Sequence, residues 1–424
     1  MRKIGGARIK KRIKKITKRI KISEHIKMEK IDHEIYLDHA ATTRVDERVV
    51  KKMLPYFTLD YGNANSQHFY GREAQKAVDA ARDEIANIIG AHHSEIYFTS
   101  GGTEADNWAV KGIAYANRSK GKHIIMSKIE HAAMLATGKQ LEKEGFDVSY
   151  IGVDAGGFLN LEELKAAIRP DTVLICCMYA NNEIGTIEPI EEIVKIAKEH
   201  GILTFTDSVQ AMPCMNINVK ELGVDLMSFS SHKFNGPKGV GVLYVRNGVK
   251  IDNLVAGGEQ ERTKRGGTTN VPGVVVMAEA LRLNRETLEK DNAYVKTLRD
   301  AFVSRVENEI PFARYNGDRV KRVPSNADFS FEFIEGESIL FSLDLAGIAV
   351  SSGSACSSGS LEPSHVLLAI GVPVELAHGS IRFSFGKENT MDEVNYVVDK
   401  LKETVEKLRN MSPLYKVNSE VKKA

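Results

Sequence analysis

Residues 202–245 read ILTFTDSVQAMPCMNINVKELGVDLMSFSSHKFNGPKGVGVLYV, and this stretch decides the fold. It contains three short apolar runs, at 202–206, 226–229 and 241–245. Runs of this length between glycine and polar residues are typical of buried strands. Asp207 directly follows the first run, and Lys233 closely follows the second. Polar side chains at such positions predict a site beyond the carboxyl ends of the strands of a parallel sheet.

The same alternation of strands and helices extends upstream. Further apolar runs predict strands at 96–99, 123–126 and 173–179. Residues 72–89 and 190–197 carry apolar side chains at helical spacing, and a glycine, a common helix stop, follows each stretch closely. Short strands that alternate with helices imply a largely parallel sheet with helices on both faces.

A different pattern begins after about residue 284. It predicts a long helix over 285–306 and a last amphipathic helix behind a capping box that starts at Thr390. Strands are expected near 329–333, 348–351 and 380–385. The predicted fold class is therefore α/β, with a large domain on a mostly parallel sheet and a smaller α+β domain. The expected divisions are a basic extension at 1–30, a large domain at 43–285, and a small domain made of 31–42 and 286–424.

The composition excludes several classes of protein. The chain has 424 residues, of which 42% are apolar and 27% charged, as in ordinary globular enzymes. Its apolar runs are far too short to cross a bilayer, so no membrane span is expected. The four cysteines show neither CxxC nor Cys/His metal spacing, and they are Cys176, Cys177, Cys214 and Cys356. We therefore expect no metal site, a reducing compartment and at most one working thiol.

The first 30 residues stand apart. They hold 13 Lys/Arg against two Glu, a net charge of +11, so the remainder carries −9 of the overall +2. Isoleucines recur there at helical spacing, which would suit an amphipathic helix on an anionic membrane or RNA, or a transit peptide. The favoured interpretation is a disordered, solvated extension without stable nucleic-acid binding. We expect a cytoplasmic protein, or an organellar matrix protein if this segment is a targeting signal.

Polar residues stand at five predicted strand ends, and their types together fit pyridoxal phosphate. This cofactor needs a lysine amine that bonds it, a carboxylate against its pyridine nitrogen, a phosphate cup and a group over its ring. Lys233 and Asp207 supply the first two. A glycine-rich turn that opens a helix presents free N–H groups to a phosphate. The cup is assigned to Gly102, Thr103, Ser230 and His232, and the ring face to His131.

Cys356 lies in the stretch SSGSACSSGS at 351–360, in which eight of ten residues are Gly or Ser. Such a composition predicts a flexible, solvated loop, whereas a structural cysteine is usually buried. Alone, this pattern more often marks a surface loop that happens to hold a cysteine. Beside a cofactor site, it predicts a reactive thiol on a mobile arm.

Eight short segments carry a family signature. They are YLDHAATT at 36–43, FTSGGTE at 98–104, EH at 130–131, NNEIG at 181–185, SSHK at 230–233, RGGT at 265–268, SSGSAC at 351–356 and ELAHGSIRF at 375–383. The chain resembles the cysteine desulfurases of the NifS/IscS type, which are fold-type I pyridoxal phosphate (PLP) enzymes of the class-V aminotransferase family. The similarity spans about residues 34–415. Its cysteine loop separates this group from the other desulfurase class and from aminotransferases.

The resemblance implies how the cofactor is held. Lys233 would bond PLP, Asp207 would face its pyridine nitrogen, and Gln210 with Asn182 would contact the side of the ring hydroxyl. The phosphate would be bound by Gly102, Thr103, Ser230 and His232. It would also be bound by a residue from the other protomer, Thr268, which implies a homodimer.

The resemblance also implies the reaction. Arg382, with Asn182, would bind the carboxylate of L-cysteine, a task suited to the bidentate guanidinium fork. Cys356 would take the sulfur as a persulfide and leave L-alanine, while His131 would move protons. Cys356 is also the candidate contact for a nascent iron–sulfur cluster.

The implied function is a cysteine desulfurase that supplies sulfur to an iron–sulfur scaffold protein of the IscU/NifU type and to tRNA thiolation. Two alternatives stay open at this point. A selenocysteine lyase could release selenium without an attack by Cys356. A non-catalytic binding protein of the same fold would not need Lys233 or Arg382. A PLP absorbance band and alanine release from L-cysteine would separate the three.

Overall fold

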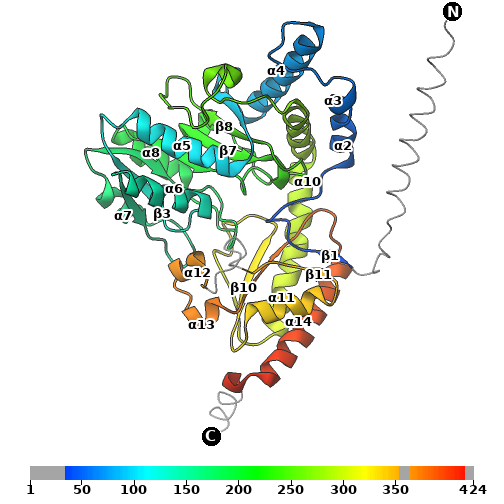
Figure 1. Cartoon of the computed structure of the whole chain (residues 1–424). Coiled ribbons are helices and arrows are strands. Elements are labelled where there is room, and N and C mark those ends of the chain that lie inside the picture. The colour runs from blue at the N-terminus through cyan, green and yellow to red at the C-terminus, as the bar shows by residue number, and fades with distance from the viewer. Residues whose placement is uncertain (1–33, 353–361, 416–424) are drawn as a thin grey trace, which may run out of the picture.

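A computed structural model describes residues 34–352 and 362–415, which form two lobes (Figure 1). The larger lobe contains the central sheet and most of the helices, and the smaller lobe contains two short sheets and the last long helix. Helix α10 (Val271–Glu309) runs from one lobe into the other. The basic extension and Cys356 lie outside the described residues.

The central sheet has seven strands in the order β2-β8-β7-β6-β5-β3-β4. All neighbouring pairs are parallel except the two that involve β8, so the prediction of a mostly parallel sheet is confirmed. The strands are β2 (Ile96–Thr99), β3 (His123–Ser127), β4 (Asp147–Ile151), β5 (Thr172–Cys176), β6 (Leu203–Asp207), β7 (Leu226–Ser230) and β8 (Gly241–Val245).

Successive residues of a strand enter different cores, because side chains alternate across a sheet. In β3, Ile124 and Met126 pack in one core, whereas Ile125 packs in the core on the other face. Both faces are covered by helices, which explains why the strands read as continuous apolar runs. The helices of this lobe are α2 (Glu47–Met53), α3 (Pro55–Thr58), α4 (Phe69–Ile89), α5 (Gly102–Ala116), α6 (Ala132–Lys143), α7 (Leu161–Ala167), α8 (Ile190–Glu199) and α9 (Val219–Leu222).

The smaller lobe has its own core, which joins both ends of the described chain. Ile35 and Leu37 are buried there with Phe329 and Phe383, and Phe302 of α10 packs on Phe383 with ring centroids 4.6 Å apart. One sheet has the order β12-β10-β9, and β1 pairs with β11. The elements are β1 (Ile35–Tyr36), β9 (Ala313–Tyr315), β10 (Asn326–Phe331), β11 (Ile348–Ala349), β12 (Ser380–Ser384), α11 (Gly336–Asp344), α12 (His365–Ala369), α13 (Val374–Ala377) and α14 (Met391–Met411).

Helix α10 is longer than the sequence pattern indicates. It begins at Val271 rather than at 285, and the Asn270 side chain caps it by accepting a hydrogen bond from Gly273 N at 3.1 Å. Its first half is buried on several sides, so it shows no polar face that the periodicity could reveal. The expected domain boundary at 285 falls between the half in the larger core and the half in the smaller core. Neither α10 nor any other described helix is both long and apolar enough to cross a membrane.

The sequence pattern does not predict strand β4. This strand lies at the edge of the sheet, and four of its five residues are only partly buried or exposed. An edge strand buries little on either face, so it needs neither a continuous apolar run nor strict alternation.

Candidate active site

The reversed direction of β8 brings two distant strand ends together. Thr99 at the end of β2 and Ser230 at the end of β7 both pair with Gly241 of β8. A Cβ atom on Gly241 would lie 2.8 Å from the Cα of Gly101, so only glycine lets the turn after β2 approach this closely. The turn that opens α5 therefore lies beside the segment that carries Lys233.

A cavity of about 300 Å³ lies at this edge of the sheet. This is at the low end of typical ligand pockets, about 300–1,000 Å³. Ten of the residues singled out from the sequence line it: Gly102, Thr103, His131, Asn182, Asp207, Gln210, Ser230, His232, Lys233 and Arg382. Thr268 is not among the lining residues of its own subunit, and Cys356 lies outside the described part of the chain.

Lys233 is held against the backbone of the N-terminal segment. It ends a short 3₁₀ turn after β7, and its amine donates hydrogen bonds to the carbonyls of Ala40 and Ala41. Gln210 Nε2 also donates to the Ala40 carbonyl, at 2.9 Å. The YLDHAATT segment therefore positions the lysine and closes one side of the cavity.

Asp207 is a buried carboxylate at the end of β6. One of its oxygens, Oδ1, accepts a hydrogen bond from Val209 N at 2.8 Å. Burial raises the pKa of Asp207, whereas His131, the Val209 N–H and Lys233 act in the opposite direction. A positively charged group facing Asp207 would favour its ionised form, as a protonated pyridine nitrogen does.

His131 caps helix α6 and lies at the cavity. Its Nδ1 accepts a hydrogen bond from Ala133 N at 3.2 Å, so the neutral ring carries its proton on Nε2. Burial lowers the pKa of His131; the charge of Asp207 raises it and that of Lys233 lowers it further. This histidine is therefore neutral at physiological pH and can exchange a proton at Nε2.

The first turn of α5 offers free N–H groups to an anion. Among the described residues, no side chain caps this helix at Gly101, and Gly102 and Thr103 of its first turn line the cavity. Helix N-termini of this kind favour phosphate. Burial, with the charges of Lys233 and Lys238, lowers the pKa of His232 to about 4, so the histidine is a neutral donor until an anion arrives.

Arg382 lines the same cavity and is 3% exposed. Its two terminal nitrogens donate to the carbonyl of Asn182 at 2.8 Å and to Oδ1 of Asp38 at 2.9 Å. Its Nε has no partner among the described residues. An unpartnered buried N–H beside a cavity is suited to a carboxylate, which an arginine binds through two parallel hydrogen bonds.

Three buried carboxyl groups at the site were not predicted from the sequence. Asp106 lines the cavity and accepts a hydrogen bond from Ser228 at 2.6 Å, and burial with the nearby Asp207 holds its pKa well above the ordinary value. Burial also strongly raises the pKa of Glu130, which accepts from Met178 N at 2.7 Å. The third is Glu183. The sequence offered one sign that Asp106 is buried, because its carboxylate stands on the apolar face of a helix.

Glu183 gives the stability of the protein a measurable pH dependence. Burial raises its pKa to about 8, although the hydrogen bond from Ser364 lowers it, the nearby Asp328 raises it further and Arg382 lowers it. The unfolded value is about 4.3. Glu183 therefore contributes its full stabilisation of the fold below about pH 4.3, its pKa in the unfolded chain. This stabilisation is lost as the pH rises to about 8, and above that pH it no longer changes.

We expect Glu183→Gln to gain stability over the wild type as the pH rises. Between about pH 6 and pH 8 the difference in the free energy of unfolding should grow by about 2 kcal/mol. Urea unfolding at several pH values measures it, with the partly exposed Glu73→Gln as a control. A difference that does not change with pH would show that Glu183 is ionised throughout.

The donor set fits PLP as a whole. A lysine amine, a buried carboxylate, a neutral histidine and an open helix N-terminus surround one cavity. Arg382, whose Nε has no partner among the described residues, completes this set of groups. These are the groups that a PLP enzyme uses to bond its cofactor, hold the ring and the phosphate, and bind an amino-acid carboxylate.

Comparisons with known proteins agree with this site. The class-V aminotransferase family model matches residues 35–397. Cysteine desulfurase IscS of Dictyoglomus turgidum is 53% identical over 380 residues, which are 90% of this chain and 96% of that protein. Cysteine desulfurase IscS of Methanosarcina thermophila is 52% identical, over 90% of this chain and 94% of its own length. A solved NifS-like protein superposes with a TM-score of 0.83 at 40% identity, covering 88% of this chain and all of that one.

Proposed function

Because this chain belongs to the class-V aminotransferase family and is a PLP-dependent cysteine desulfurase of the NifS/IscS type, we propose specific roles for its residues in converting L-cysteine to L-alanine. The observation that carries the proposal is the meeting of Lys233, Asp207, His131 and Arg382 around one cavity. Each of these residues comes from a different element, and all four line one cavity.

The cofactor would be held at its ring and at its phosphate. Lys233 would bond it, Asp207 would pair with its pyridine nitrogen, and Gln210 with Asn182 would contact the ring hydroxyl side. The phosphate would be bound by the first turn of α5, including Gly102 and Thr103, and by Ser230 and His232. When bound, PLP supplies an electron sink for the bonds of the amino acid attached to it.

The substrate would be oriented by its carboxylate. Arg382 would turn its Nε and one terminal nitrogen to the two carboxylate oxygens, with Asn182 alongside. Because the arginine is anchored by Asn182 and Asp38, the substrate would be bound with little loss of side-chain entropy.

Cys356 would accept the sulfur. Its thiolate would attack the sulfur of the bound L-cysteine, forming a sulfur–sulfur bond while the bond between sulfur and Cβ breaks. The electron pair left on Cβ takes a proton, which gives the methyl group of L-alanine. His131 would move protons in the cavity through Nε2, because its Nδ1 accepts the hydrogen bond from Ala133 N.

The test of this function is a single-turnover assay with L-cysteine. We expect one L-alanine released for each sulfur gained by the protein, and mass spectrometry should locate that sulfur on the peptide with Cys356. Release of alanine with the sulfur free in solution as elemental sulfur, and none on the protein, would contradict this route and favour a lyase mechanism.

Arg382→Ala is expected to weaken the use of L-cysteine at least tenfold in apparent KM while PLP stays bound. A hydrogen bond to a charged group contributes about 1.5–3 kcal/mol, and this arginine would make two. Arg382→Lys is the matched control, because it keeps the charge but not the fork, and it should recover only part of the loss. An unchanged KM in Arg382→Ala would mean that another cation binds the carboxylate.

We also propose that the enzyme is a homodimer with shared sites. Large apolar side chains of α3 and its surroundings are exposed, including Leu54 (59%), Phe57 (57%), Leu59 (68%) and Phe69 (61%). Exposed apolar clusters of this kind mark protein interfaces. Thr268 does not line the cavity of its own subunit, which supports its predicted place at the phosphate of the other protomer.

Sedimentation should therefore give twice the chain mass of 46.9 kDa. Phe57→Glu should shift the protein towards monomers and lower its PLP occupancy together, because the interface and the site would be lost as one. A monomer with full PLP occupancy would contradict the shared site.

The sulfur on Cys356 would pass to an acceptor. We propose a scaffold protein of the IscU/NifU type for iron–sulfur assembly, with tRNA thiolation as a second outlet, and a cytoplasmic setting in which thiols stay reduced. The three cysteines in the described residues are free thiols, which agrees with a reducing compartment.

A further inference from the structure

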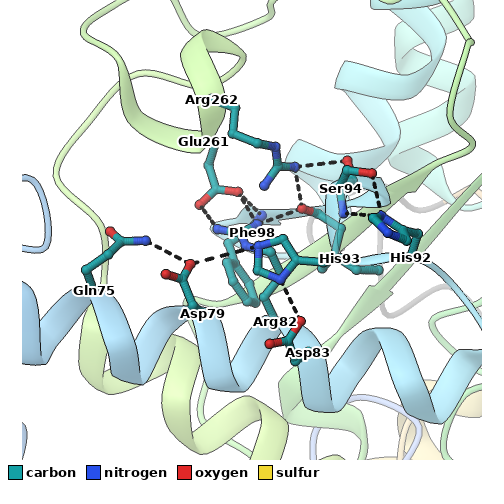
Figure 2. Close-up of polar contacts among 11 residues, drawn as sticks. Gln75, Asp79, Arg82, Asp83, His92, His93, Ser94, Phe98, Glu261 and Arg262 are labelled. Atoms are coloured by element: carbon teal, nitrogen blue, oxygen red, sulfur yellow. Dashed lines mark hydrogen bonds and ion pairs between the residues drawn. The ribbon is translucent and has the colours of Figure 1, made fainter.

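Glu261 is a buried carboxylate in the loop that leads to Thr268. Its side chain is 5% exposed, and that of Arg82 in α4 is 4% exposed. Arg82 donates from its two terminal nitrogens to the two carboxylate oxygens, at 2.7 and 2.9 Å (Figure 2). Phe98 N donates to the same carboxylate at 3.1 Å. A buried ion pair of this kind contributes little net stability, but its bidentate form fixes geometry.

Side chains of the loop cover the free edge of β2, one of the two edge strands of the sheet. The Ile96 carbonyl accepts hydrogen bonds from Arg82 at 2.6 Å and from Arg262 at 2.8 Å. Arg262 also lies over the ring of Tyr97, 4.3 Å from its centroid. These groups, with Glu261 on Phe98 N, occupy positions that another strand would otherwise take. The start of the loop is therefore fixed to the sheet (Figure 2).

The backbone at this point is strained. Glu261, Arg262 and Thr263 have φ values of 47°, 56° and 67°, three consecutive left-handed residues that are not glycine. Side chains disfavour this conformation, and it persists only where the surroundings determine it. The bonds of Glu261 and Arg262 to α4 and β2 are those surroundings.

The strained turn determines the path of the chain to Thr268. Lys264 N donates to the Glu261 carbonyl at 3.1 Å, and Gly267 N donates to the side chain of Gln260 at 3.2 Å. A Cβ atom on Gly266 would lie 2.6 Å from the Cα of Gly257, so the two ends of the loop touch. The loop is thus a closed unit whose orientation follows from its anchor at Glu261.

A second tether joins this loop to the phosphate end of its own cavity. Arg265 donates to both oxygens of Glu104 in α5, at 2.8 and 3.0 Å. Glu104 in turn accepts a hydrogen bond from Ser100 N at 2.9 Å, in the turn that opens α5. The loop therefore has two fixed points, one on α4 and β2 and the other on α5, and residues 266–268 follow the second.

We propose that Glu261 is a positioning residue, which holds this loop so that Thr268 reaches the phosphate of the cofactor bound in the other subunit. The inference rests on the shared homodimer site proposed above. It adds a residue outside the cavity to the determinants of cofactor affinity.

The first experiment measures the dissociation constant of PLP by titrating the apoprotein. Glu261→Gln should raise this constant about tenfold, the size expected for losing one hydrogen bond to a charged group. Glu73→Gln, which removes a partly exposed carboxylate from α4, the helix that carries Arg82, is the matched control and should leave it unchanged. Arg82→Lys keeps the buried charge but not the fork, and it should cause a smaller rise. This second variant also serves if Glu261→Gln does not fold.

A double-mutant cycle separates positioning from general structural damage. If Glu261 acts through Thr268, Thr268→Ala and Glu261→Gln together should weaken PLP no more than Thr268→Ala alone. Additive losses would mean that Glu261 supports the fold in general, and they would overturn the proposal.

Mixed dimers with two affinity tags test the direction of action. In a dimer of Glu261→Gln with Lys233→Ala, only the Glu261→Gln subunit keeps its lysine. Its cavity meets the intact loop of the Lys233→Ala subunit, so its PLP affinity should be that of the wild type. In a dimer of wild type with the Lys233→Ala/Glu261→Gln double variant, only the wild-type subunit keeps its lysine. Its cavity meets the altered loop of the other subunit, so its PLP affinity should fall about tenfold.

The outcomes distinguish the two proposals. If the loss follows the subunit that carries both Lys233 and the altered Glu261, the loop acts within its own subunit and the shared site is wrong. If Thr268→Ala weakens PLP across the dimer but Glu261→Gln and Arg82→Lys do not, the shared site stands and the role of Glu261 is wrong.

Discussion

Lys233→Ala is expected to leave a folded protein that no longer bonds PLP and has lost roughly a thousandfold or more of its desulfurase activity. The lysine amine donates to the backbone carbonyls of Ala40 and Ala41, and the Ala40 carbonyl keeps its hydrogen bond from Gln210 in the variant, so the fold should survive the change. Reduction with borohydride followed by mass spectrometry should find no cofactor attached to the chain. The yellow colour of the bound cofactor should be lost near neutral pH.

Lys238→Ala is the matched control for this change. Lys238 is an exposed residue five positions further along the chain, so its removal should leave the covalent attachment intact. A Lys233→Ala protein that still carries reducible, covalently attached PLP would show that another amine bonds the cofactor.

Cys356→Ser is expected to bind PLP and L-cysteine normally but to release almost no alanine, again a loss of roughly a thousandfold or more. A serine hydroxyl is far less nucleophilic towards sulfur than a thiolate. The residues proposed to hold the cofactor and the carboxylate are unchanged in this variant. After a single turnover, the wild type should carry one additional sulfur per subunit and the variant none.

The other cysteines should not replace Cys356. Burial raises the pKa of Cys176 and Cys177 well above the ordinary value, and it raises the pKa of Cys214 to about 12. Their thiolates are therefore scarce at neutral pH. Cys214→Ser is the control and should turn over like the wild type. A sulfur found on Cys214, or normal turnover by Cys356→Ser, would contradict the persulfide route.

The sequence allowed most of the sheet and the cavity to be predicted, because both depend on local patterns. A buried strand must be apolar along its length, and a polar residue at its end is conspicuous. Thus the sequence alone predicts Asp207 and Lys233 beyond the carboxyl ends of neighbouring strands, and both line the cavity. The order of the strands and the reversal of β8 depend on long-range pairing, which local patterns do not encode.

The residues that escaped prediction act through partners distant in sequence. Glu261 and Arg82 are 179 positions apart, and nothing in either local sequence indicates a buried pair. Asp106 and Glu183 lie within helix and turn segments, where a carboxylate is ordinarily solvated. The start of α10 was missed for the opposite reason, because a helix buried on several sides has no polar face to give it a period.

The pairing of β1 with β11 has a consequence for how the protein is made. Ile35 aligns with Ile348, so strand β1 must wait during synthesis for a partner made roughly 300 residues later. At roughly 5–20 residues per second, the wait is about 15–60 s. During that time the segment with Ala40 and Ala41 has no smaller lobe to hold it over Lys233. The nascent chain can thus assemble its central sheet first, and its cofactor cavity closes only after β11 has been made.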